Sequence, residues 1–198
     1  MSLATQFPRR IARRMKFSLT YDGSLFSATD KHSRVRNKNE LRFHFSSQLM
    51  VVADRGDFTR LETRVRPRGQ SKGASVLTMR NFHGLYFWPL VARETKASCA
   101  LSIKLMRPEA PGQIVHGGDL DNRLKTLLDA LRLPLDKKEV LPKLAPAATA
   151  DTLYTCLLED DSLITELNIS AVMLLTPIPK NHVRLVIDVE LRPFDFDA

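Results

Sequence analysis

Two carboxylates, an amide and a lysine stand close together in the run G-G-D-L-D-N-R-L-K-T-L-L-D-A-L-R, residues 117–132. Asp119 and Asp121 are two residues apart, and Lys125 follows four residues after Asp121. Carboxylate oxygens are the ligands that Mg²⁺ and Mn²⁺ prefer, and two or three of them leave room for water and phosphate oxygens. A metal ion there can stabilise the charge that develops during phosphodiester hydrolysis, while a lysine steadies the phosphate. The pattern therefore predicts a metal site that hydrolyses nucleic-acid phosphodiesters.

A second acidic group follows in the run L-L-E-D-D, residues 157–161. Its two leucines lead directly into acids, which suggests an ordered segment that carries Asp160 and Asp161 to the site. We expect Asp160 and Asp161 to join Asp119 and Asp121 in holding the metal. A plainer interpretation stays open, because D-L-D-N is a frequent helix start and an Asp with Lys at i+4 is an ordinary surface pair.

Leucines spaced along the first run predict a helix that is anchored on a core. The apolar stripe consists of Leu120, Leu124, Leu127, Leu128 and Leu131. Asp121, Lys125 and Asp129 are four residues apart and share another face. Residues two apart in a helix point about 200° away from each other. Asp119 and Asp121 can therefore converge only if the helix begins between them or just after them.

The rest of the chain shows alternating and helical patterns. We expect strands over 15–21, 84–92, 99–106, 167–175 and 183–191, the last two as an antiparallel pair joined through Pro177 and Pro179. Pro89 argues for an edge position or a break in its strand. Residues 38–52 predict an amphipathic helix with Leu41, Phe45, Leu49 and Val52 on its apolar face and Arg42 and Gln48 on the other. Pro- and Gly-rich stretches predict connections over 108–118 and 134–152.

Positive charge is concentrated in the first part of the chain. Residues 1–80 hold 17 Lys and Arg against 6 Asp and Glu, whereas the whole chain has a net charge of +8. Such an imbalance is typical of proteins that bind a polyanion, most often nucleic acid. Residues 64–74 read as a mobile basic loop. The expected nucleic-acid contacts are Arg34, Arg36, Arg64, Arg66, Arg68 and Lys72.

Length and composition predict one ordinary domain over residues 1–198. The apolar fraction is 43% and charged residues make up 26%, as in soluble globular proteins. Cys99 and Cys156 lack the spacing of a disulfide framework or a zinc site, the five histidines are scattered, and no secretory signal or membrane-spanning run is visible. We therefore expect a cytoplasmic protein. The sequence contains no dinucleotide fingerprint, phosphate-binding glycine loop or Ser-His-Asp order.

These residues resemble the RusA-type endodeoxyribonucleases that resolve Holliday junctions. The likeness rests on G-D-L-D-N-R-L-K-T-L-L-D-A-L at 118–131 and on E-D-D at 159–161, within a motif-bearing core of residues 98–192. The resemblance implies that Asp119, Asp121 and Asp161 bind metal, usually Mg²⁺, and that Lys125 is needed for catalysis. It also implies a compact α+β fold, a mixed sheet with helices packed on it, and a homodimer that acts on four-way DNA junctions in recombination and repair. Residues 134–155 would be an insertion.

Three alternatives stay open. A metal nuclease could prefer flaps, single strands or RNA. A protein with the same fold could bind nucleic acid without catalysis, which predicts salt-sensitive binding that is indifferent to Mg²⁺. The basic part could instead bind an acidic protein partner.

Overall fold

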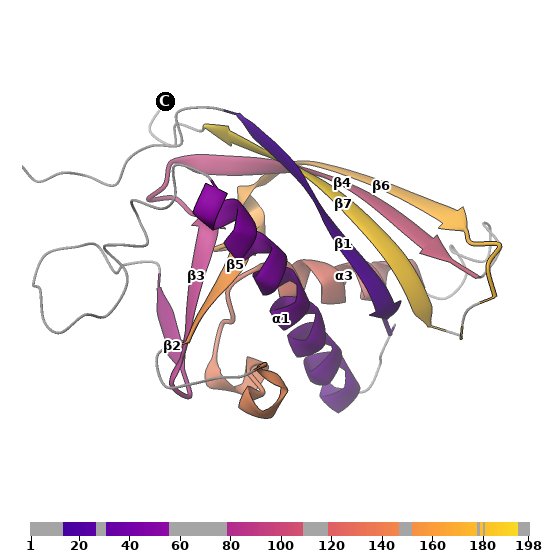
Figure 1. Ribbon diagram of the computed structural model, residues 1–198, viewed down its shortest axis with the longest axis horizontal. Coiled ribbons are helices and arrows are strands. Elements are labelled where there is room, and N and C mark those ends of the chain that lie inside the picture. The colour runs from indigo at the N-terminus through magenta and orange to yellow at the C-terminus, as the bar shows by residue number, and fades with distance from the viewer. Residues whose placement is uncertain are drawn as a thin grey trace, which may run out of the picture.

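Two β-sheets and the helices packed between them make up the described part of the chain (Figure 1). The computed structural model describes residues 14–26, 31–55, 79–108, 119–146, 152–177, 179 and 181–193. Among these residues, each sheet contains both parallel and antiparallel neighbours. The expected single compact α+β domain with mixed pairing is confirmed. No helix of the described segments has the length and apolarity to cross a membrane.

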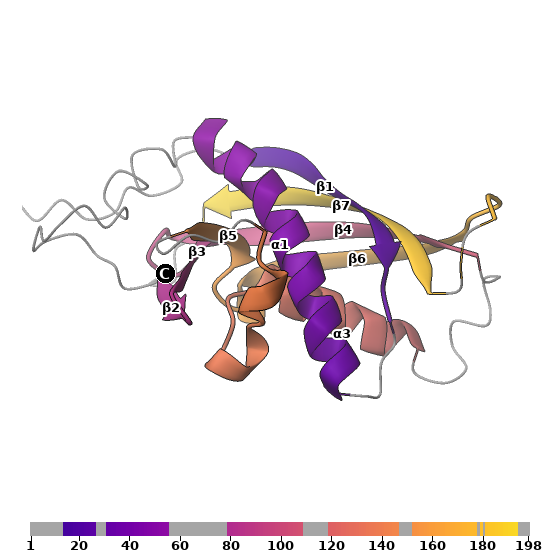
Figure 2. The same cartoon turned by 60° about the horizontal axis from the view of Figure 1, so that its bottom comes forward.

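The four-stranded sheet has the order β1-β7-β4-β6. Its strands are β1 (Met15–Ser24), β4 (Ala97–Arg107), β6 (Ile164–Met173) and β7 (His182–Pro193). β7 pairs antiparallel with β1 and β4, and β4 pairs parallel with β6. Side chains alternate between the two faces of a strand, so Leu185, Ile187 and Val189 of β7 are buried on one face. Figures 1 and 2 show α1 and α3 on the same side of this sheet.

A three-stranded sheet with the order β2-β3-β5 lies beside the first. β2 (Arg80–Phe82) and β3 (Leu85–Val91) form a hairpin, and β5 (Leu153–Leu158) pairs parallel with β3. His83 and Gly84 make the hairpin turn, both with positive φ, as a two-residue turn of this kind requires. β3 is the central strand of this sheet, but among the described residues Pro89 itself pairs only with Cys156 of β5, so the expected edge position is correct at this residue. β2 pairs only with residues 85–87, so it ends before Pro89.

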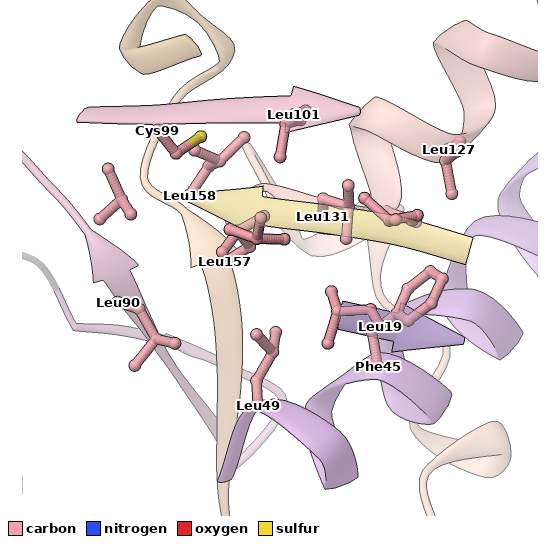
Figure 3. Close-up of a cluster of buried hydrophobic side chains, with 14 of the residues drawn as sticks. Leu19, Phe45, Leu49, Leu90, Cys99, Leu101, Leu127, Leu131, Leu157 and Leu158 are labelled. Carbon is pink, nitrogen blue, oxygen red and sulfur yellow. The ribbon is translucent and has the colours of Figure 1, made fainter. Parts of the chain in front are cut away.

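The helices bury most of the core between the sheets. α1 (Lys31–Arg55) and α3 (Asp119–Leu131) pack against each other, and α1 also contacts β5 and β1. Figure 3 shows the core where side chains from α1, α3 and both sheets meet: Leu19, Phe45, Leu49, Leu90, Cys99, Leu101, Leu127, Leu131, Leu157 and Leu158. The predicted leucine stripe of α3 is confirmed, since all five of its leucines lie in or against this core.

α1 begins earlier and is buried more widely than its apolar pattern predicts. Leu41, Phe45 and Leu49 are buried as expected, but Arg42 is also buried. Its guanidinium donates to the carbonyl oxygens of Asp129 (2.9 Å) and Glu139 (3.3 Å). Placing Arg42 on a solvent face was therefore wrong. A charged side chain is tolerated inside a protein when its donors find partners, and here backbone carbonyls provide them.

The stretch after α3 folds back as two short 3₁₀ helices, η1 (Lys137–Glu139) and η2 (Pro142–Leu144). Val140 is buried in a second apolar cluster with Phe43, Phe87 and Tyr154. The predicted insertion of residues 134–155 is thus partly packed, and its last three residues already belong to β5.

The strands β6 and β7 are not paired with each other. β4 lies between them, parallel to β6 and antiparallel to β7. The expected antiparallel pair joined through Pro177 and Pro179 is therefore wrong. Both strands exist close to their predicted positions, but their pairing partners are set by β4, which comes much earlier in the chain.

Candidate metal site at the start of α3

The candidate site lies at the N-terminal end of α3. The backbone is already helical at Asp119, so the helix begins at the first acid and neither between the acids nor after them. The side chain of Asp119 lies outside the described residues. Asp121 is in the first turn, where free amide hydrogens and the helix dipole favour a negative charge.

Asp121 and Lys125 are both exposed, one turn apart on α3. Among the described residues, neither side chain takes part in a hydrogen bond or an ion pair. Asp129, one turn further on, differs: it accepts from Lys38 Nζ at 3.3 Å and from Arg132 Nη2 at 2.9 Å. Asp129 is therefore a structural residue, whereas Asp121 and Lys125 have no partner among the described side chains.

The second acidic group lies in η3 (Asp161–Leu163), between β5 and β6. Asp160 is the N-cap of this turn, and its Oδ1 accepts from the Ser162 backbone N–H at 3.0 Å. Hydrogen bonds from Ser162 lower the pKa of Asp160 below its ordinary value. Asp161 is exposed. Asp160 thus has a local structural role that its sequence position also permits.

The structure does not bring the two acidic groups together. Leu133 N donates to Leu158 O at 2.8 Å, which places the end of β5, and so Asp160 and Asp161, beside the C-terminal end of α3. Asp121 belongs to the other end of a 13-residue helix, about 15 Å away along the helix axis at 1.5 Å per residue. Figures 1 and 2 show these two ends apart.

The described side chains fit a metal ion only in part. Asp121 supplies one hard oxygen ligand in the first turn of α3, which suits Mg²⁺ or Mn²⁺. No group of three or more His, Cys, Asp or Glu side chains that could hold a metal is present among the described residues. Within one chain, Asp161 is too distant to share a metal with Asp121.

The predicted nucleic-acid contacts have different outcomes. Arg34 is half-buried, and exposed Arg36 pairs with Glu40 at 2.9 Å. Lys38, two residues after Arg36, is buried between Asp129 and Glu139. Arg64, Arg66, Arg68 and Lys72 lie outside the described residues. The first turns of α1 therefore offer less free positive charge than the sequence suggests.

Sequence reasoning missed the polar groups that hold this end of the molecule. Arg123 is buried and donates to the Leu25 carbonyl and to Asn181 Oδ1. A signal for it was present, since Arg123 is three residues after Leu120 and four before Leu127, on the stripe itself. Asp22 accepts hydrogen bonds from His182 and from Arg184 Nε. Local sequence patterns do not predict these contacts, because about 160 residues separate the partners.

A shallow depression of about 370 Å³ lies elsewhere, on the open face of the four-stranded sheet. Its lining includes Ser102, Glu166, Asp188, Glu190 and Arg192. Arg192 pairs with Glu166 at 3.0 Å and with Glu190 at 3.1 Å, so these charges offset one another. The helices cover the opposite face, and the depression is separate from the start of α3.

Comparisons with protein-family models, curated proteins and solved structures gave no match for this chain.

Proposed function

We propose that the protein is a Mg²⁺-dependent endonuclease that hydrolyses phosphodiesters in branched DNA, during recombination and repair in the cytoplasm. Asp119 and Asp121 hold the metal, and Lys125 contacts the phosphate. One observation carries the proposal: Asp121 and Lys125 are exposed one turn apart on a firmly packed helix, and no described side chain neutralises either of them.

The surroundings of α3 suit this chemistry. A bound divalent ion would polarise the phosphate and lower the pKa of a water molecule that attacks it. The leucine stripe holds the helix, and the backbone therefore fixes the spacing between Asp121 and Lys125. The ammonium group of Lys125 can pair with a phosphate oxygen without first breaking an ion pair to any side chain that the structure describes.

The test is cleavage of a synthetic four-way junction by the purified full-length protein in Mg²⁺. Wild type should cut the junction, and cutting should stop in EDTA. Asp121→Asn should abolish cleavage while junction binding, measured by fluorescence anisotropy, changes little. If wild type cuts no junction, duplex, flap, single strand or RNA with Mg²⁺ or Mn²⁺, the catalytic proposal fails. If the protein cuts another substrate in preference to the junction, the proposed nuclease activity stands and the proposed substrate is replaced.

Asp161 needs its own test, because it lies at the far end of α3. A site that uses both Asp121 and Asp161 requires either a second protomer or a rearrangement of the chain. We propose a homodimer, so the two acids can be separated genetically. Asp121→Asn and Asp161→Asn proteins, each inactive alone, should recover activity when mixed if the acids of one site come from different protomers. Full activity of Asp161→Asn alone would remove Asp161 from the site.

The separation of the acidic groups favours one second candidate, a nucleic-acid-binding protein without catalysis. In that case α3 is a capped surface helix, and the lysines and arginines account for binding. This candidate predicts salt-sensitive binding that neither Mg²⁺ nor Asp121→Asn changes. The cleavage and binding measurements above distinguish it from the nuclease.

A further inference from the structure

Arg123 is the polar anchor of the first part of α3. Its side chain is 2% exposed, and of the side chains from 120 to 125 it alone is buried. Its Nη1 donates to the Leu25 carbonyl at 2.7 Å, and its Nη2 donates to Asn181 Oδ1 at 2.9 Å. A buried guanidinium is stable only when such partners satisfy it, so these contacts fix its direction.

The partners of Arg123 join segments that are far apart in the sequence. Leu25 follows β1, and Asn181 precedes β7. These two residues also contact each other, since Leu25 N donates to Asn181 O at 2.9 Å. Asn181 has a φ of 66°, a left-handed conformation that asparagine adopts more readily than most residues. Arg123 therefore ties the start of α3 to a small junction at the end of the four-stranded sheet.

This anchor sets the rotation of α3 about its axis. Residues two apart in a helix point about 200° away from each other. Because Arg123 points into the protein, Asp121 on one side of it and Lys125 on the other both point outward. Leu120 and Leu124 are only half-buried, so they constrain this part of the helix less than Arg123 does.

We propose that Arg123 is a positioning residue for phosphodiester cleavage: through Leu25 and Asn181 it holds Asp121 and Lys125 toward the metal and the phosphate. This inference rests on the proposed function. It assigns Arg123 no contact with substrate or metal.

Two variants test the anchor at its two ends. Arg123→Lys shortens the fork to a single ammonium, and Asn181→Gly removes only the side-chain acceptor while glycine tolerates the left-handed backbone. Thr95→Ala is the matched control, because Thr95 is buried and hydrogen-bonds Ala92 N and Ala92 O in the turn between β3 and β4. All variants are assayed at a temperature at which thermal unfolding shows each to be fully folded.

We expect Arg123→Lys and Asn181→Gly to slow single-turnover junction cleavage between about 10- and 100-fold, the effect of a small misplacement of reacting groups. Both variants should also need more Mg²⁺ for half-maximal rate and show faster amide hydrogen exchange over residues 120–125. Thr95→Ala should cut at the wild-type rate with unchanged Mg²⁺ dependence. Wild-type rate and Mg²⁺ dependence in Arg123→Lys would overturn the inference, and so would equal losses in Thr95→Ala.

The wild-type protein tests the proposed function, and the variants test the role of Arg123. If wild type itself does not cut, the nuclease proposal and the role of Arg123 in it fall together. If wild type cuts and the two anchor variants cut equally well, only the role of Arg123 falls.

Discussion

Asp121, Lys125 and Asp129 are each four residues apart on α3, but the structure gives them different surroundings. Asp129 lies in a buried network with Lys38, Arg132 and Glu139. Asp121 and Lys125 face solvent. Spacing along a helix predicts which side chains share a face, but it does not tell which of them already have protein partners.

Glu139 provides a pH-dependent test of that network. Burial by itself raises the pKa of Glu139, but the Leu135 amide, Lys38 and Arg132 outweigh burial, so the pKa lies below its ordinary value. A carboxyl with a lowered folded-state pKa stabilises the protein above the unfolded pKa, about 4.3, and loses that contribution as the pH falls through the folded pKa. Glu139→Gln should therefore cost about 1–3 kcal/mol at pH 7 and less in acid.

Urea unfolding over a pH series measures this effect. Glu40→Gln is the control, because Glu40 forms an i,i+4 surface pair with Arg36 that contributes only about 0.3–0.5 kcal/mol. A Glu139→Gln penalty that stays constant down to pH 3, or one no larger than that of Glu40→Gln, would contradict the assigned role.

Among the secondary-structure elements, α1 is joined to the edge strand β1 by the side chain of Gln48, which hydrogen-bonds the backbone as a neighbouring strand would. Gln48 Oε1 accepts from Thr20 N at 2.9 Å, and Gln48 Nε2 donates to Thr20 O at 2.7 Å. An edge strand exposes such unpaired backbone groups, and the amide of Gln48 pairs with both.

Gln48→Ala should therefore destabilise the protein by about 1–2 kcal/mol and speed amide exchange at Thr20. Ser47→Ala is the control on the same helix, since Ser47 Oγ donates only to the His44 carbonyl. Exchange measured by mass spectrometry or NMR distinguishes the two. Equal exchange at Thr20 in both variants would show that Gln48 does not hold the strand.

Local periodicity predicted most helices and strands, but it did not predict which elements pack or pair with each other. The strands β1, β3, β4, β6 and β7 and the helix α3 lie close to their expected ranges, whereas α1 contains its expected range and begins seven residues earlier. The assumed β6–β7 pair was wrong because β4 binds both, a long-range choice that neighbouring residues do not encode. Arg42 was misplaced because α1 is covered on more than one side, and its partners Asp129 and Glu139 lie about 90 residues away.

In the candidate site, the residues on α3 were predictable from local spacing, but the position of Asp161 relative to them was not. The placement of Asp121 and Lys125 on an anchored helix follows from spacing, and both side chains are exposed in the structure. The approach of Asp161 depends on how β5 leads into β6, and the chain takes it to the opposite end of α3. The partners of buried Arg123 were not predictable from local spacing, because Leu25 and Asn181 are 98 and 58 residues away in the sequence.

For the whole molecule, the proposed binding of nucleic acid and the uneven charge together predict that residues 64–74 contribute to the interface. Replacing Arg64, Arg66, Arg68 and Lys72 together by alanine should weaken DNA binding and reduce the slope of log affinity against log salt, by about 0.9 for each lost phosphate contact. Lys137→Ala with Lys138→Ala, in exposed η1, should change the slope little. Anisotropy titrations at several salt concentrations measure both. Equal slopes in the two variants would remove these four basic residues from the interface.

The proposed function requires that Asp121 holds a divalent metal, and calorimetric titration with Mn²⁺ tests this without depending on the choice of DNA substrate. Wild type should bind Mn²⁺ and Asp121→Asn should not. Asp188→Asn, which alters an exposed acid on the open face of the sheet, should bind as wild type does. Identical Mn²⁺ binding by wild type and Asp121→Asn, or no binding by wild type, would contradict the claim.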